Sequence, residues 1–207
     1  MRRCPIVLAI LLALCGCATT SMHSRRNREF RDAAYKNLLV IAAFGDLSLQ
    51  EALERKIRDE LALLHVRCEM GHEVIFPGKS YTAEEYSELI DSLWVRGVLI
   101  ITSSGSGYSK TYIPPSTRTK TKGTATRTYG GGFRYNEKSK TTTSGGYNIH
   151  KPWASFVAEL YDVNTGEPVW YATASTRGNA FANFKNVVRS MGEKTVTMLA
   201  KDSLLIR

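Results

Sequence analysis

The chain has 207 residues, of which 43% are hydrophobic and 23% are charged, and its formal net charge is +9. A chain of this length can form one domain with a substantial core. The charge is unevenly distributed, because residues 102–152 hold nine basic and one acidic side chain, while the rest of the chain beyond residue 16 is near neutral. This distribution excludes a uniformly basic protein and assigns the basic character to one inserted segment.

The first residues, MRRCPIVLAILLALCGC, have the pattern of an export signal. Two arginines precede an apolar run at 6–14, which is too short to span a bilayer as a helix. The run ends in Leu-Cys-Gly-Cys at 14–17, which resembles the bacterial lipobox, with Cys15 where alanine or serine is commoner. The resemblance implies a signal peptide over 1–16 and acylation of Cys17 with fatty acids such as palmitate.

The residue after Cys17 is Ala18 rather than aspartate. In lipoproteins of the enteric type, this pattern implies passage to the outer membrane. We therefore expect a lipid-anchored protein of the cell envelope that faces the periplasm. Because such a protein rarely meets DNA, we do not expect the basic segment to bind nucleic acid.

Cysteine usage agrees with this compartment. If the signal is removed and Cys17 is acylated, Cys68 is the remaining thiol, so no disulfide forms within the mature chain. Cys68 alternates with Val66 and Met70, which indicates a buried strand position rather than a reactive thiol.

Residues 18–35 are polar and rich in arginine, and they predict a tether between Cys17 and a single domain over 36–207. The arginines of this tether could rest on anionic headgroups, or the segment could be a plain solvated linker.

The first half of the domain predicts three strands. A continuous apolar run at 37–44 is typical of a strand buried on both faces, and shorter apolar strands are predicted at 66–70 and 98–101. Helical patterns separate these strands. The order β-α-β-α-β therefore predicts parallel strands joined by crossover helices.

Each of the two helices between these strands begins with a capping box, Ser48 with Glu51 and Thr82 with Glu85. The apolar stripes that follow comprise Leu49, Leu53, Ile57, Leu61 and Leu64 in the first helix and Tyr86, Leu89, Ile90 and Leu93 in the second. Glu54 falls opposite the first stripe, so we expect it to face solvent.

An insert at 105–150 separates this half from the rest of the domain. Alternating residues at 153–174, with turn chemistry at 164–166, then predict an antiparallel hairpin. Asn179 is expected to cap a closing helix whose apolar side comprises Phe181, Phe184, Val188, Met191, Met198 and Leu199. The predicted fold class is α/β (α+β): a β-α-β-α-β half, an antiparallel hairpin and a C-terminal amphipathic helix, interrupted by a long basic hairpin or loop.

These features resemble a group of bacterial envelope lipoproteins that share an anticodon-binding-like α/β domain. The group includes curli-secretion channel lipoproteins, penicillin-binding-protein activator lipoproteins and the amino-terminal domain of Tol-system translocation proteins. The resemblance covers about 38–104 and 152–205, and its most specific part is LYDVNTGEPVW at 160–170. The matching residues there are Leu160, Asp162, Thr165, Gly166 and Trp170. Such a match implies the fold far more than the function.

No group of residues in the sequence forms a catalytic pattern. The segment SGSGYSKT at 104–111 resembles a phosphate-binding loop, but it lacks a glycine before Lys110, and two following prolines prevent the required helix. The histidines and carboxylates within 65–73 are expected to lie along a strand and its ends without converging on a metal. We therefore expect no enzymatic activity, no metal site and no cofactor.

The basic segment at 117–143 alternates threonine with lysine and arginine around a glycine cluster at 130–132. This alternation predicts an extended hairpin, and the composition fits a disordered loop equally well. A strand that crosses a bilayer needs about 9–11 residues with an apolar outward face, which threonine does not supply. We predict that the segment binds an anionic surface through Arg118, Lys120, Lys122, Arg127, Arg134, Lys138 and Lys140.

Together these patterns predict a non-catalytic outer-membrane lipoprotein that acts as an envelope binding or accessory module. Its expected partners are the membrane, through the lipid anchor at Cys17, and an anionic lipid, a glycan or an envelope protein at the basic segment. The alternative is a subunit of an oligomeric outer-membrane export channel. The sequence does not specify an oligomeric state.

Overall fold

The computed structural model describes residues 17–127 and 133–206, without the side chains of 126–135. The signal peptide predicted over 1–16 lies outside the described residues. The chain forms two compact units. The first, which we call the body, comprises residues up to Ser109 and from Lys151 onward, and the second, the ribbon unit, comprises Lys110–His150.

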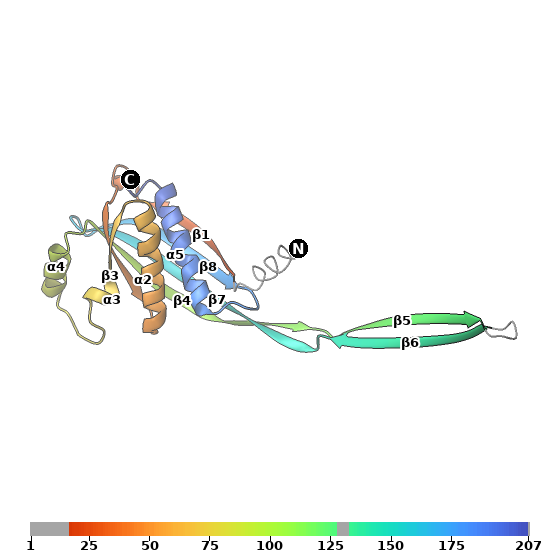
Figure 1. Ribbon diagram of the computed structural model, residues 1–207. Helices are drawn as coiled ribbons and strands as arrows, with labels where there is room; N and C mark the ends of the chain where they lie inside the picture. Colours follow the sequence, from red (N-terminus) through yellow and green to blue (C-terminus); the bar gives the residue numbers. More distant parts are fainter. Residues whose placement is uncertain (1–16, 128–132, 207) are drawn as a thin grey trace, which may run out of the picture. The chain divides into compact units, whose positions relative to one another are not determined.

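A six-stranded sheet forms the centre of the body, in the order β1-β8-β7-β4-β2-β3 (Figure 1). β2 pairs in parallel with both β3 and β4, whereas β8 pairs antiparallel with both β1 and β7. The α/β class and the predicted order of elements are therefore confirmed. The strands span Ala18–Arg26 (β1), Asn37–Ala43 (β2), Arg67–Met70 (β3), Gly97–Ile113 (β4), Tyr147–Asp162 (β7) and Pro168–Gly178 (β8), and β4 and β7 continue into the ribbon unit.

Two long helices, α2 (Leu47–Leu63) and α5 (Phe184–Lys201), lie side by side on one face of the sheet (Figure 1). The predicted stripe of α2 is confirmed, since Leu53, Ile57 and Leu61 are fully buried. In α5 the predicted residues Val188, Met191, Met198 and Leu199 are buried, whereas Phe181 precedes the helix and is 64% exposed. Within the described part of the chain, no helix is both long and apolar enough to cross a membrane.

Three shorter elements complete the body: η1 (Arg28–Phe30), α3 (Gly71–Val74) and α4 (Ala83–Ser92). Ile90 and Leu93 pack against a small second cluster built on Leu39, Val95 and Val98. No residue of α4 is fully buried. Of its predicted stripe, Ile90 and Leu93 contact this small cluster rather than the main core, and Tyr86 is 39% exposed.

One of the three predicted helix caps is present in the structure, and at the other two helices a different residue forms the cap. Thr82 and Glu85 form the predicted capping box of α4. At α2 the cap is Asp46 rather than Ser48, because the Asp46 carboxylate accepts from the backbone N–H groups of Ser48 and Leu49 (2.8 and 3.2 Å). At α5 the cap is Asn183 rather than Asn179.

Residues 18–35 were predicted to form a tether, but in the structure Ala18–Arg26 forms the edge strand β1. β1 pairs with β8 along its whole length, from Ala18 opposite Gly178 to Arg26 opposite Trp170. The strand β1 therefore follows Cys17 directly.

The polar residues of β1 that face inward explain why its sequence suggested a linker. The hydroxyl of Thr20 hydrogen-bonds to the hydroxyls of Thr176 and Ser190 (2.8 and 2.9 Å), and Ser24 donates to the Asp202 carboxylate (2.6 Å). Because these groups have partners, burying them costs little free energy. They also interrupt the apolar alternation that would mark a strand.

Glu54 is the second correction. It was predicted to face solvent, but its exposed fraction is 1%. Its carboxylate accepts from the backbone N–H groups of Ala42 (2.8 Å) and His72 (2.9 Å), and His72 Nδ1 lies 2.5 Å from Oε2. Glu54 thus links α2 to the end of β2 and to α3.

Candidate anionic-ligand interface

The basic segment forms an ordered antiparallel ribbon of two strands, β5 (Ser116–Arg127) and β6 (Phe133–Ser144). Of the two possibilities that the sequence left open, the structure therefore has the hairpin. The described side chains of both strands, at 116–125 and 136–144, are exposed.

The register of the ribbon separates its side chains into two faces. On one face, threonines stand opposite one another, and hydroxyl pairs join Thr117 to Thr143 (3.3 Å) and Thr119 to Thr141 (3.2 Å). Because successive residues of a strand point to opposite sides, the basic residues between these threonines share the other face. We call it the lysine face; its described basic members are Arg118, Lys120, Lys122, Lys138 and Lys140.

Two rungs of the lysine face bring like charges together. Lys120 stands directly opposite Lys140, and Lys122 directly opposite Lys138. Side chains in such pairs have Cβ atoms about 5 Å apart, and like charges directly opposite each other oppose strand pairing. The lysine face is therefore a concentrated positive surface.

The remaining two residues predicted for this site are Arg127 and Arg134. Their backbones lie in β5 and β6, with Arg127 opposite Phe133 and Arg134 opposite Thr126. Their side chains lie outside the described residues. The structure thus brings five of the seven predicted basic residues onto one face and does not describe the side chains of the other two.

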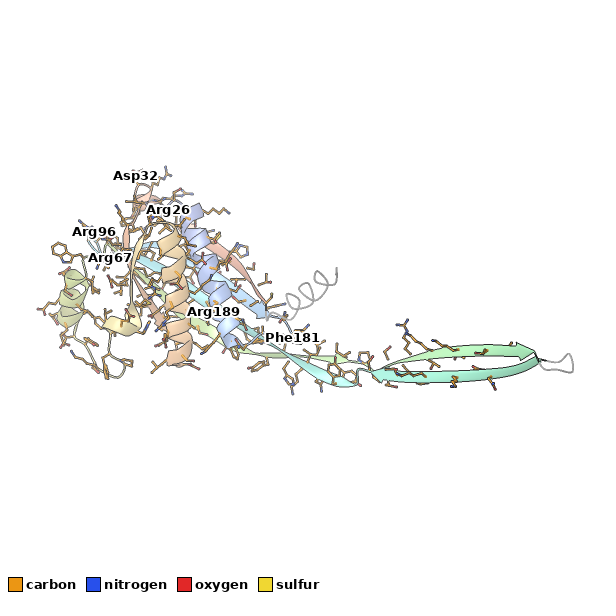
Figure 2. The ribbon with its side chains drawn as sticks, in the orientation of Figure 1. Arg26, Asp32, Arg67, Arg96, Phe181 and Arg189 are labelled. Carbon is orange, nitrogen blue, oxygen red and sulfur yellow. The ribbon has the colours of Figure 1, made fainter. Side chains whose placement is uncertain are left out.

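Two arginines of the segment predicted as a tether, Arg25 and Arg26, lie in β1. Arg26 has an internal role, since its guanidinium donates to the carbonyls of Phe30, Ala33 and Asp202 (2.8, 2.6 and 2.8 Å). Figure 2 shows Arg26 at the same end of the body as Asp32. Arg25 is exposed, but an extended strand of eight residues places it about 27 Å from Cys17.

Cys17 is exposed and precedes β1 directly, and its carbonyl accepts from the backbone N–H of Asn179 (2.9 Å). Cys68 is partly buried in β3. Burial, with a smaller contribution from the nearby Glu54 carboxylate, raises the pKa of the Cys68 thiol to about 12. This thiol is therefore protonated at neutral pH, as expected for a structural cysteine.

The histidines and carboxylates at 65–73 are engaged in separate interactions. His72 pairs with Glu54, and Glu69 forms an ion pair with Arg67 (2.7 Å). Across 17–127 and 133–206, no three or more histidine, cysteine, aspartate or glutamate side chains are arranged so that they could hold a metal ion. The segment 104–111 lies within β4 and has no helix after it.

The sequence matches no protein-family model and no curated protein. Among solved structures, a dodecameric variant of PelC from Paraburkholderia phytofirmans is similar, with 14% identity over 90% of this chain and 99% of that chain and a TM-score of 0.50. The PelC dodecamer of the same organism has 15% identity over 91% of this chain and 100% of that chain, with a TM-score of 0.48. Lipoprotein GNA1162 from Neisseria meningitidis has 14% identity over 80% of this chain and 98% of that chain, with a TM-score of 0.42. At these identities, the likeness to the PelC variant shows a shared fold alone.

Proposed function

We propose that this protein is a non-catalytic lipoprotein of the bacterial outer membrane, facing the periplasm. In this proposal the body is a scaffold anchored through Cys17, and the ribbon is an accessory module that binds an anionic partner. The pattern Leu-Cys-Gly-Cys at 14–17 supports the anchor, and the ribbon supports the binding role.

The register of the ribbon is the observation that carries the binding role. An exposed strand pair that served only as a spacer would be more stable with alternating charges across its rungs. This ribbon instead has five basic side chains on one face, and its carboxylate Glu137 stands opposite Gly123 on the other face. An anionic partner compensates for that arrangement.

Replacing the ribbon unit tests this role. With Lys110–His150 exchanged for a short Gly-Ser linker, we expect the body to stay folded, because its core lies outside the exchange and the Ser109 hydroxyl already donates to the Lys151 carbonyl (3.4 Å). Binding to anionic vesicles and to purified cell wall should be lost. The measurement is co-sedimentation of protein carrying Cys17→Ala, at low and high salt, because screening of exposed charges weakens such contacts.

One control shows whether the exchanged protein is still folded. Circular dichroism of the exchanged protein should retain the helical signal of α2 and α5. If the parent binds neither surface, or if the exchanged protein binds as well as the parent, the ribbon does not bind an anionic partner.

The anchor has a separate test. Cys17 is exposed at the start of β1, so acylation would hold the body at the bilayer surface without an intervening linker. Several acyl chains, each contributing about 0.8 kcal/mol per buried methylene, would make that attachment stable. We expect Cys17→Ala to abolish labelling by a fatty-acid probe in cells, whereas Cys68→Ala should label like the parent. Labelling of Cys17→Ala at the parental level would refute the lipoprotein assignment.

The second candidate function is a subunit of an oligomeric export channel. It is favoured by the PelC variant, which shares the fold and is described as a dodecamer. Sedimentation in detergent distinguishes the two functions. A binding module is expected to be a monomer or a small assembly, and a channel subunit a ring of defined size that resists dilution.

A further inference from the structure

We propose that the lysine face binds a linear acidic polysaccharide. The polymer lies lengthwise on this face, between the row of basic side chains from β5 and the row from β6. This inference rests on the proposed function, which gives the ribbon an anionic partner, and it names the chemical class of that partner.

The dimensions of the charged strip fit a single polymer chain. Residues of one face repeat about every 7 Å along a strand, so the strip from Arg118 to Lys122 is about 14 Å long. The lysines opposite, Lys138 and Lys140, form the second row at a Cβ separation of about 5 Å. A chain with repeated carboxylates that lies between these rows would contact a lysine on each side at successive rungs.

Within its described residues, the ribbon has no counter-charge on this face. Glu137 lies on the threonine face, and no ion pair joins Lys120, Lys122, Lys138 or Lys140 to a carboxylate. A bound polyanion would remove the repulsion between the opposed lysines. Binding should therefore stabilise the pairing of β5 with β6 as well as neutralise the face.

The neighbours of the lysines favour a sugar polymer. Ser116 opposite Ser144, and Thr124 opposite Asn136, flank the charged rungs on the same face and offer hydroxyl and amide groups to sugar hydroxyls. The same unit exposes Tyr112 and Tyr147 (58% and 56%), whose rings suit stacking on sugars.

A bilayer fits this face less well than a polymer does. Interfacial membrane binding buries large apolar side chains alongside the basic ones. Among the described side chains of β5 and β6, Ala125 is the only apolar one. The ribbon could therefore contact a membrane through charge alone, along a strip two lysines wide.

The test uses the full chain carrying Cys17→Ala, with galacturonate and its linear dimer, tetramer and octamer as probes, and with phosphatidylglycerol vesicles as the comparison. We expect affinity per carboxylate to rise steeply from the monomer to the tetramer and octamer, and to fall with salt. The octamer should also slow hydrogen exchange of the backbone amides in β5 and β6. Vesicles of equal total charge should bind more weakly than the octamer.

A matched pair of variants assigns the binding to the lysine face. Changing its four lysines to glutamine (K120Q, K122Q, K138Q and K140Q) should weaken octamer binding about 16-fold, since each exposed ion pair contributes a factor of about two. The control makes the same change at four lysines of the body: Lys36, Lys185, Lys194 and Lys201. It removes an equal charge and should bind within about twofold of the parent.

The outcomes separate this inference from the proposed function. If the octamer binds no better per carboxylate than the monomer, or if the body variant loses as much affinity as the ribbon variant, the polysaccharide site is wrong. If vesicles bind through the ribbon and the octamer does not, the anionic-partner function stands and this inference fails. If the chain binds neither, both fail.

Discussion

Replacing Glu54 with alanine is expected to lower the free energy of unfolding by about 3–5 kcal/mol. The carboxylate is buried, with two backbone N–H donors and the His72 ring as partners. Its removal leaves the N–H groups of Ala42 and His72 without an acceptor inside the fold. The measurement is the midpoint of urea-induced unfolding, compared between variants whose unfolding free energy depends on urea concentration with the same slope.

The control for this change is Glu51→Ala in the same helix. The Glu51 side chain is 44% exposed and contacts Arg55 in a surface ion pair. Its loss should cost under about 0.5 kcal/mol. Equal shifts for Glu51 and Glu54 would show that the buried carboxylate does not stabilise the end of β2.

Leu53→Ala is expected to cost about 2–5 kcal/mol. Leu53 is fully buried where α2 meets α5, and a Cβ on Gly192 would lie 3.2 Å from its Cδ1 atom. The two helices therefore approach closely at this point, so a truncated side chain leaves a cavity that the packed helices cannot readily fill.

Leu63→Ala is a matched control, because it makes the same chemical change in the same helix at a side chain that is 74% exposed. It should change stability by less than about 0.5 kcal/mol. Similar urea midpoints for the two leucine variants would mean that the buried side of α2 is wrongly assigned.

The elements that the sequence predicted well are those whose inward side chains are apolar. The strand at 37–44 could be recognised from its continuous run of apolar residues, and the stripe Leu53, Ile57 and Leu61 from apolar residues at helical spacing. The capping box at Thr82 could be recognised because it depends on neighbouring residues.

The features that the sequence predicted wrongly are those in which polar side chains face the core. β1 faces the core with Thr20 and Ser24, whose partners Thr176, Ser190 and Asp202 lie more than 150 residues along the chain. Glu54 likewise accepts from groups on two other elements. No local pattern records such partners, so a buried polar side chain has the same sequence signature as an exposed one.

For the candidate site, the alternation of basic residues predicted that Arg118, Lys120 and Lys122 share a face, and the structure has this arrangement. The opposition of Lys120 to Lys140 could not be predicted. It depends on the register of β5 against β6, and a shift of one residue would place threonine opposite lysine instead.

The position of β1 has a consequence for the order of folding. Thr20 and Thr176 are 156 residues apart, yet they lie in neighbouring strands. Closing so long a segment costs entropy before any contact is gained, so this pairing should form late. Until then β8 is an open sheet edge, and a partly folded chain would offer that edge to other unfolded chains. β1, which precedes the other strands of the described chain, is thus expected to be the last to join this side of the sheet.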